Sequence, residues 1–326
     1  MPPFAPHPDV VGRFRRDLDA LFAGAGQIGV AVSGGPDSLA LLLLAAAAFP
    51  GRVHAATVDH RLRPDSAIEA LHVEDLCARI GCPHTILAVH VPDGPAGLQA
   101  EARSARYGAL RDWAERQGIA ALLTAHHADD QAETLLMRLQ RGSGIAGLSG
   151  IRAERPLAPG VTLLRPLLGW TKAELVRVAG DAGLDPADDP SNRDPRFDRV
   201  RMRAFLAEHP EFEPKRLART AAALREADEA LAWQAERLWG ERPTSGEGEW
   251  RLDVAGLPRE FKRRLLGRAI AAARAEHGLE PAWSGSEDVE PLLRTLEAGG
   301  TGTLGGILAE GGPLWRLRVA PPRRSA

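Results

Sequence analysis

Short apolar segments alternate with longer helical patterns through the first half of the chain. Four of these segments are predicted to be strands: QIGVAVS at 27–33, VHAATVDH at 53–60, HTILAVHV at 84–91 and IAALLTAHH at 119–127. Their apolar residues do not alternate strictly with polar ones, which is typical of strands buried on both faces of a sheet. Each is followed by an amphipathic or alanine-rich segment of helical length. This alternation predicts an α/β fold, a Rossmann-like open parallel sheet with helices on both faces.

The clearest single helix in this half is expected at 97–118, and a fifth strand is expected to begin at Val161. In the segment that follows this strand, Thr171 and Glu174 have the spacing of a helix capping box. The stretch after that, 185–198, is dense in proline, aspartate and asparagine and is predicted to be a structured loop that closes the first domain.

The remaining sequence has a different pattern. A long charged amphipathic helix is expected at 214–240, and PTSGEGE at 243–249 is expected to be a linker or exposed loop. The chain then ends in a glycine-rich, hairpin-like segment. We therefore predict a catalytic domain over residues 1–205, followed over residues 206–326 by a helical linker and a smaller, mostly helical accessory domain.

The bulk composition restricts the class of protein. The chain has 326 residues, of which 44% are hydrophobic and 26% charged, as in ordinary soluble globular proteins. Its N-terminus lacks an apolar signal core, and its longest apolar run, Leu39–Phe49, is too short to span a membrane. The only two cysteines, Cys77 and Cys82, do not suffice for a disulfide scaffold or a four-cysteine zinc site. We expect a cytoplasmic protein with no membrane partner.

The segment SGGPDS stands where the first predicted strand gives way to a helix. Its glycines allow a tight turn close to a ligand, and the N-terminus of the following helix attracts an anion, most naturally a phosphate. An aspartate does not attract phosphate directly, so Asp37 is expected to bind it through a magnesium ion. The segment has no lysine and therefore differs from the GxxxxGK[ST] loop. A purely structural turn is the alternative. The predicted nucleotide-binding residues of this loop are Ser33, Gly34, Gly35, Pro36, Asp37 and Ser38.

A second polar segment, HHADDQAET at 126–134, follows the fourth predicted strand. Asp130 and Glu133 are three residues apart, hence on one face of a helix, and such carboxylates bind a cation or an ammonium group. Two alternatives remain open. One is that Asp129 or Asp130 only caps the helix. The other is a catalytic zinc site, for which the competent ligands would be His126, His127, Asp129 and Asp130.

Together these segments resemble a known family. SGGPDS resembles the pyrophosphate loop of the adenine nucleotide alpha hydrolase-like enzymes, which cleave ATP between the α and β phosphates. Within that superfamily, four further strings resemble tRNA(Ile)-lysidine synthetase: VDHRLRPDSAIEA at 58–70, QAEARSARYGAL at 99–110, TAHHADDQAET at 124–134 and DDPSNRDPRFDRVRMR at 188–203. The sequence departs from the family pattern at Arg61, where glycine is usual, and at Val200, where asparagine is usual. The resemblance covers roughly the first 200 residues.

The resemblance implies an ATP- and Mg²⁺-dependent ligase that modifies isoleucine tRNA with a CAU anticodon. Such an enzyme adenylates C2 of the wobble cytidine and then joins free L-lysine to it, giving lysidine, AMP and pyrophosphate. Asp130 and Glu133 would receive lysine, and Asp37 would bind the metal. Arg106 and His126 would contact the α-phosphate or the adenylated base. Thr57, Val58 and Asp59, at a neighbouring strand end, would complete the adenine site.

RNA contacts are expected from basic segments, because backbone phosphates bind clustered arginines whatever the net charge, which here is −2. Three runs are rich in arginine: 196–203, 261–268 and 315–324. In the first run we predict that Arg199, Arg201 and Arg203 bind tRNA. Trp233 and Trp239 have helical spacing, which favours core packing over base stacking. A solvated face is the alternative for 261–268.

Other functions are also compatible with the loop. A tRNA thiolase would need placed reactive cysteines, whereas Cys77 and Cys82 are better explained as buried structural residues. An amidotransferase would need a glutaminase nucleophile, and the C-terminal 120 residues contain no cysteine. A non-catalytic nucleotide-binding module would gain nothing from the acidic segment beside a polyanion. The oligomeric state stays open, with a homodimer as one alternative.

Overall fold

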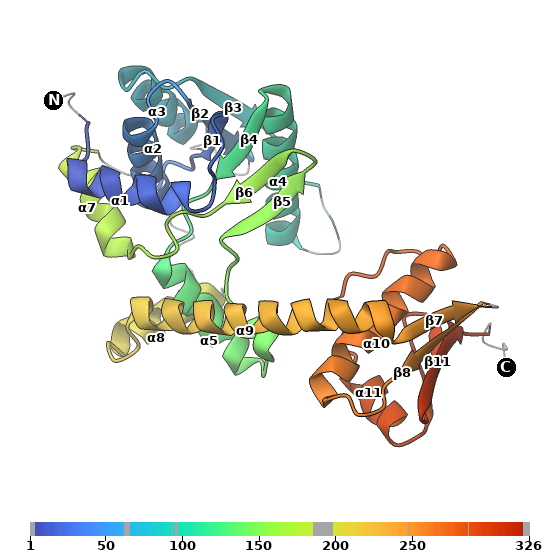
Figure 1. The fold of residues 1–326 in the computed structure, drawn as a ribbon. Coiled ribbons are helices and arrows are strands. Elements are labelled where there is room, and N and C mark those ends of the chain that lie inside the picture. Colours follow the sequence, from blue (N-terminus) through green and yellow to red (C-terminus); the bar gives the residue numbers. More distant parts are fainter. Residues whose placement is uncertain are drawn as a thin grey trace. The chain divides into compact units, whose positions relative to one another are not determined.

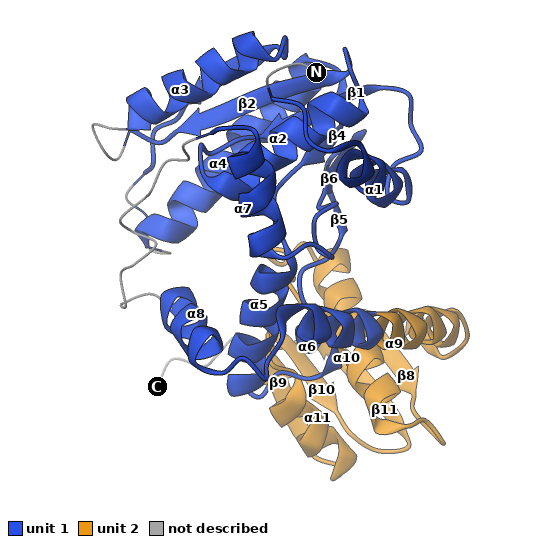
Figure 2. Cartoon of the chain, turned by 90° about the vertical axis from the view of Figure 1, so that its left-hand side faces the viewer, with its two compact units in different colours: residues 1–225 blue, residues 226–326 orange. Residues whose placement is uncertain are grey.

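The computed structural model describes residues 4–61, 66–92, 94, 97–184, 198–246, 248–285 and 287–321. The chain divides into two compact units, residues 1–225 and residues 226–326 (Figure 2). Within the described ranges, none of the helices combines the length and the apolar character needed to cross a membrane. The predicted loop at 185–198 lies almost entirely outside the described residues.

The first unit is built on a six-stranded sheet in the order β3-β2-β1-β4-β6-β5 (Figure 1). Its strands are β1 (Gln27–Ala31), β2 (Val53–Asp59), β3 (His84–Ala88), β4 (Ile119–Leu123), β5 (Glu154–Ala158) and β6 (Val161–Leu164). Five strands are parallel, and only the edge strand β5 pairs antiparallel, with β6. The strand order reverses on either side of β1, and open α/β sheets bind ligands at the carboxyl ends of strands beside such a switch point. The predicted parallel sheet is confirmed; β5 was not predicted.

The helices before residue 209 are α1 (Pro8–Asp19), α2 (Pro36–Ala48), α3 (Ser66–Arg79), α4 (Leu98–Arg116), α5 (Ala128–Gln140), α6 (Ile145–Leu148), α7 (Lys172–Asp181) and α8 (Asp198–Glu208). As predicted, helices cover both faces of the sheet: α1, α2, α3 and α7 contribute to the core on one face, and α4 contributes to the core on the other. Helix α7 begins with the capping box predicted for Thr171 and Glu174. Helix α4 confirms the helix predicted at 97–118.

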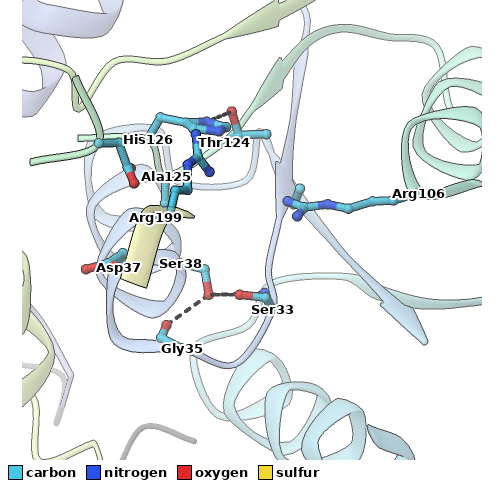
Figure 3. Close-up of a pocket in the computed structure, with 11 residues that line it drawn as sticks. Ser33, Gly35, Asp37, Ser38, Arg106, Thr124, Ala125, His126 and Arg199 are labelled. Carbon is cyan, nitrogen blue, oxygen red and sulfur yellow. Dashed lines mark hydrogen bonds between the residues drawn. The ribbon is translucent and has the colours of Figure 1, made fainter. Parts of the chain in front are cut away.

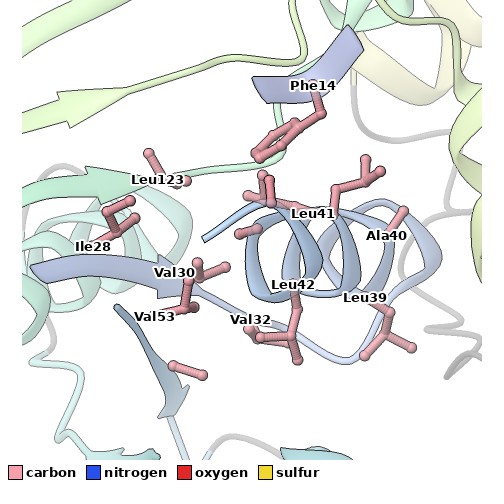
Figure 4. Packing of buried hydrophobic residues seen from close by; sticks show 14 of the residues in the cluster. Phe14, Ile28, Val30, Val32, Leu39, Ala40, Leu41, Leu42, Val53 and Leu123 are labelled. Carbon is pink, nitrogen blue, oxygen red and sulfur yellow. The ribbon is translucent and has the colours of Figure 1, made fainter. Parts of the chain in front are cut away.

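Alternate residues of the central strands point into two separate cores. Ile28 and Val30 of β1 pack with α1, α2 and α3 on one face (Figure 4). Ala31, by contrast, packs with α4 on the other face. Helix α2 is apolar all round and almost completely buried, which is why it lies centrally against the sheet. Each buried leucine contributes roughly 2 kcal/mol to folding, so this helix anchors the loop that precedes it.

The long helix α9 (Pro214–Glu241) confirms the predicted amphipathic helix, and the division between the two units falls within it at 225/226. The sequence placed the domain boundary twenty residues earlier, at 205/206, within α8. The second unit continues with β7 (Pro243–Gly246), β8 (Glu249–Asp253), α10 (Arg259–Glu276), α11 (Glu290–Glu297), β9 (Thr301–Leu304), β10 (Ile307–Glu310) and β11 (Leu314–Val319).

The strands of the second unit form one antiparallel sheet in the order β7-β8-β11-β10-β9, packed against α10 and α11. Helices outweigh strands in this unit, as expected, and the glycine-rich hairpin at its end is confirmed. Two details were wrong. Residues 243–246 of the predicted linker form strand β7, which pairs antiparallel with β8. Trp233, predicted to pack in a core, is 61% exposed, whereas Trp239 stacks on Trp250.

Candidate active site

The SGGPDS loop connects β1 to α2 and is held in shape by its own hydroxyl groups. Gly34 has φ 84°, in the left-handed region that favours glycine. The Ser38 hydroxyl accepts from the Ser33 backbone N–H at 3.1 Å and donates to the Gly35 carbonyl at 2.9 Å (Figure 3). The chain's own hydrogen bonds therefore hold the turn, with the N-terminus of α2 facing the cavity beside it.

This cavity has a volume of about 170 Å³ and lies at the carboxyl ends of β1 and β4. It brings together side chains from the loop, from α4, from the end of β4, from α5 and from α8. The residues that line it are Ala31, Ser33, Gly35, Asp37, Ser38, Arg106, Thr124, Ala125, His126, Asp130 and Arg199. Eight residues of the sequence-predicted site thus converge from distant parts of the chain (Figure 3). Glu133 and the Thr57–Asp59 segment are not among the lining residues.

His126 faces the cavity as a neutral imidazole. Burial, together with the charges of Arg165, Arg106 and Arg103, lowers the pKa of His126 to about 3, although the nearby Asp130 opposes this. Its Nδ1 lies 3.1 Å from the Thr124 hydroxyl oxygen, which fixes the ring. At neutral pH this side chain can accept or donate one hydrogen bond without adding charge.

The adjacent His127, by contrast, is a buried cation among three carboxylates. Its Nε2 lies 3.5 Å from Asp37 Oδ2 and 3.6 Å from Asp130 Oδ2, and its Nδ1 lies 3.4 Å from Asp129 Oδ2. Burial alone would lower its pKa, but these carboxylates outweigh burial and raise the pKa of His127 to about 10. From the sequence, His127 was expected only as a ligand in the alternative zinc site, so this role was not predicted. The signal was its spacing from Asp129 and Asp130, but the contact with Asp37 spans ninety residues.

Helix capping, the alternative role considered for Asp129 or Asp130, is observed in α5 for Asp130. Asp130 Oδ2 accepts the His127 backbone N–H at 3.0 Å and so caps its own helix, α5. Asp129 Oδ2 instead accepts the Lys172 backbone N–H at 2.8 Å and caps α7. Asp130 nevertheless lines the cavity, so its capping contact does not remove it from the site.

Glu133 lies one turn further along α5 and is 1% exposed. Its Oε1 accepts a hydrogen bond from Arg203 Nε at 2.6 Å, and Arg203 Nη2 also lies 3.9 Å from Asp130 Oδ1. Burial raises the pKa of Glu133, and this effect exceeds the lowering by Arg203. Arg203, predicted to bind tRNA, thus pairs with both carboxylates predicted to bind lysine. Of its two companions, Arg201 pairs with Asp198, and Arg199 lines the cavity.

The Thr57–Asp59 segment at the end of β2 turns its polar side chains to local contacts. The Thr57 hydroxyl lies 2.9 Å from His84 Nε2, and Asp59 Oδ1 accepts from the Arg61 backbone N–H at 2.9 Å and from the Ser66 hydroxyl at 2.7 Å. These hydrogen bonds, that from Ser66 above all, lower the pKa of Asp59. Only the backbone groups of this segment remain for an adenine ring. Arg61 has φ 53°, which explains why glycine is the favoured residue at this position.

Asp37 fits a magnesium ion by the chemistry of its free oxygen. Its Oδ1 is buried and has no hydrogen-bond partner among the described residues, while Oδ2 faces His127. A single carboxylate beside a phosphate site is the usual protein contribution to a Mg²⁺ site, because the phosphates and water supply the other ligands. A cluster of three or more His, Cys, Asp or Glu side chains arranged to hold a metal ion is not found in the part of the chain that the structure describes.

The comparisons with known proteins agree with this geometry. Residues 11–210 match the PP-loop domain family. The tRNA(Ile)-lysidine synthase of Novosphingobium aromaticivorans is 46% identical to this chain over 96% of this chain and 94% of its own length. That of Zymomonas mobilis is 41% identical over 93% and 91%. Among solved structures, a U34-tRNA thiolase from Methanococcus maripaludis is similar in fold, with a TM-score of 0.51 and 17% identity over 67% of this chain and 80% of its own.

Proposed function

Because the chain belongs to the tRNA(Ile)-lysidine synthase family, we propose that it joins lysine to C2 of the wobble cytidine in isoleucine tRNA with a CAU anticodon. The observation that carries this proposal is the single cavity that joins a phosphate-binding loop to an acidic helix. The loop serves activation by ATP, and the helix serves an amine nucleophile. Both are needed if activation and ligation occur at one base.

In the first step the O2 oxygen of the cytidine attacks the α-phosphorus of ATP, and the bond to the β-phosphate breaks to release pyrophosphate. The loop and the N-terminus of α2 hold the leaving phosphates. Asp37 would hold Mg²⁺, which neutralises phosphate charge when it is bound. Arg106 supplies positive charge to the α-phosphate from the opposite wall of the cavity, and the neutral His126 supplies a hydrogen bond (Figure 3).

In the second step the side-chain amine of lysine attacks C2 and the C2–O bond breaks, so that AMP leaves. Asp130 and Glu133 are proposed to bind lysine through an ammonium group, which competes with Arg203 for the same carboxylates. The attacking amine must be unprotonated and loses a further proton during attack. We propose one of these two carboxylates as the proton acceptor: Asp130 lines the cavity, and burial raises the pKa of Glu133.

We propose that Arg199 of α8 contacts the RNA. Of the three arginines predicted to bind tRNA, Arg199 is the one that lines the cavity. Arg201 and Arg203 are paired with carboxylates, so we assign them the positioning of α8 and of the acidic site respectively.

Sulfur transfer is the alternative reaction on this fold, and two observations disfavour it. The chain has only two cysteines, and both Cys77 and Cys82 lie within the apolar core of the first unit. Neither lines the cavity. A persulfide or a metal–sulfur cluster would need thiolates at the activated base.

The proposal is tested with purified protein, ATP, Mg²⁺ and a tRNA transcript with a CAU anticodon, followed by mass analysis of the nucleosides. We expect a mass gain on cytidine that depends on lysine, together with one AMP and one pyrophosphate per product. A transcript with uridine at the wobble position and a reaction with ornithine in place of lysine are the matched controls. Release of pyrophosphate without a lysine adduct would refute the ligase assignment while leaving the ATP chemistry in place.

A further inference from the structure

Four arginines surround Tyr107 at the edge of the sheet that holds the active site. Arg103 and Arg106 come from α4, Arg155 from β5 and Arg165 from the residue after β6. The guanidinium carbons of Arg103, Arg106 and Arg155 lie 5.0, 5.8 and 5.1 Å from the centre of the Tyr107 ring. These distances are typical of cation–π contacts, so one aromatic ring organises three cations. We call these four residues the arginine cluster.

The arginine cluster lacks counter-charges. In the described part of the chain, no carboxylate lies within ion-pair distance of Arg103, Arg106 or Arg155. Like charges gathered in this way repel one another. Burial is the main cause that lowers the pKa of Arg165; Tyr107 opposes this lowering, and the charges of Arg155 and Arg103 add to it. The arrangement costs stability, and a ligand that supplies negative charge would recover it.

In the second unit, by contrast, arginines form ion pairs with carboxylates. Arg263, Arg264 and Arg268 belong to the run 261–268, which the sequence singled out as a candidate anion-binding surface. Each is paired: Arg263 with Glu290 at 3.0 Å, Arg264 with Glu260 at 2.8 Å and Arg268 with Glu236 at 2.9 Å. The arginines of the run 261–268 are therefore paired with carboxylates. The unpaired positive charge belongs to the arginine cluster, whose four residues are not consecutive in sequence.

The position of the arginine cluster relates it to the active site. Parallel strands end at one edge of the sheet, and the helix between β3 and β4 begins there, which places the first turns of α4 beside the end of β6. In β5, which runs antiparallel, Arg155 pairs with Leu163 near the same edge. Arg106 itself lines the cavity and reaches into it from the α4 side (Figure 3). Arg103 and Arg155 are exposed, so they form its outer part.

We infer that the outer part of the arginine cluster, Arg103 and Arg155, binds backbone phosphates of the tRNA nucleotides that flank the wobble cytidine. The inference rests on the proposed function, because it takes the anticodon loop as the polyanion. A base inserted into a cavity of about 170 Å³ leaves its flanking phosphates outside the cavity. Arg103 and Arg155 lie around the same Tyr107 ring as the cavity-lining Arg106, and the charge of Arg103 acts on the lining residue His126. Phosphate contacts fix the position of the RNA without reading its sequence. The phosphates of ATP have their own binding loop, so they do not require these arginines.

The test compares Arg103→Ala, Arg155→Ala and the double variant with Arg116→Ala. Arg116 is exposed and lies at the other end of α4, so its removal changes the net charge equally away from the cavity. Three quantities are measured for each full-length protein: the Kd for the CAU transcript without ATP at several salt concentrations, the Kd for Mg·ATP without RNA, and the Tm. The Tm identifies any variant whose binding loss comes from misfolding, and the two single variants then carry the test if the double variant does not fold.

We expect the double variant to bind the transcript on the order of 10-fold more weakly, with the slope of log Kd against log salt reduced by about one unit per arginine. Its affinity for Mg·ATP and its Tm should not fall. The inference is overturned if transcript affinity equals that of Arg116→Ala, or if only ATP binding weakens. If the wild-type protein makes no lysidine yet shows this arginine-dependent RNA binding, the proposed function fails and the phosphate site stands. Lysidine formation with normal RNA binding by the variants would refute the phosphate site alone.

Discussion

Two groups of charged residues each contribute side chains to the same cavity, and they differ in how far their charges are compensated by ion pairs. The acidic group, Asp37, Asp129, Asp130 and Glu133, is compensated in part by two cations, His127 and Arg203. The arginine cluster around Tyr107 has no such partners among the described residues. In the acidic group, an ammonium group of lysine can replace a cation that already pairs with the carboxylates. In the arginine cluster, the positive charge is unpaired within the described part of the chain and attracts a polyanion. Charge compensation thus separates the proposed lysine site from the proposed RNA site.

The largest effect is expected when one charge is removed from the acidic group while its hydrogen bonds are kept. Asp130→Asn keeps an oxygen that can cap α5 but no longer attracts an ammonium group. We expect kcat/KM for lysine to fall by roughly 100-fold or more, since the amine is no longer held beside the activated base. Steady-state kinetics and Mg·ATP binding measure this. Unchanged kinetics for lysine with loss of ATP binding would show that Asp130 serves the nucleotide instead.

The two adjacent histidines provide the next test, because one is charged and the other is neutral. His127→Gln leaves three carboxylates without their shared cation, and we expect it to lower the free energy of unfolding by about 3 kcal/mol. His126→Gln is the matched control and should cost much less, because its imidazole carries no charge. Urea unfolding of both variants measures the difference. Equal losses would mean that His127 packs in the site without acting as a cation.

Glu174 shows how a compensated carboxylate responds to pH. Burial opposes ionisation, but the Thr171 backbone N–H, Lys215 and Arg13 outweigh it and lower its pKa to about 2. Because the folded pKa lies below the unfolded one, the stabilisation is complete above about pH 4.5 and is lost as the pH falls toward 2. Glu174→Gln should therefore cost about 1–2 kcal/mol at pH 7. The gap between variant and wild type should narrow below pH 4.5, as urea midpoints at several pH values would show; a constant gap contradicts the assigned cause.

The smallest effect on stability is expected for a substitution in the arginine cluster. Arg155→Ala removes a repelled charge, so stability at low salt should be unchanged or should rise by about 0.5 kcal/mol. By comparison, Arg264→Ala, which removes an arginine paired with Asp228 and Glu260, should be destabilising. Thermal melts at low and high salt measure both. A clear loss of stability in Arg155→Ala would mean that the arginine cluster is held by contacts other than those to a ligand.

Local sequence patterns were sufficient to predict the main strands, the fold class and the family. The four apolar strands, the α7 capping box and the resemblance to the lysidine synthetases are all confirmed, because each depends on residues that are neighbours in sequence. Strand β5 was missed because ERPLA has neither an apolar run nor alternation, as befits an edge strand that contains proline. The hairpin at β7 was missed because its turn residues resemble those of a linker.

The electrostatics of the site, by contrast, could not be read from the sequence. The partners Arg203 and Glu133 are seventy residues apart, and only the packing of α8 on α5 joins them. The arginine cluster combines three elements, and no run of basic residues marks it. The arginine runs that the sequence did mark contain pairs with carboxylates, because acidic residues on the same helix or on a neighbouring helix face them. Charge compensation is a property of the fold, so it appears only once the chain is folded.

The most direct test of the account is to follow the α-phosphate of ATP. Wild-type protein and Glu133→Gln are mixed with ATP labelled at the α-phosphate, Mg²⁺ and the CAU transcript, first without lysine and then with it, and label bound to RNA is counted. We predict that labelled adenylate accumulates on the transcript in both proteins, and that lysine discharges it as AMP rapidly in the wild type and slowly in the variant. Failure of the label to reach the RNA in either protein would contradict the claim that one cavity activates the base and then delivers lysine to it.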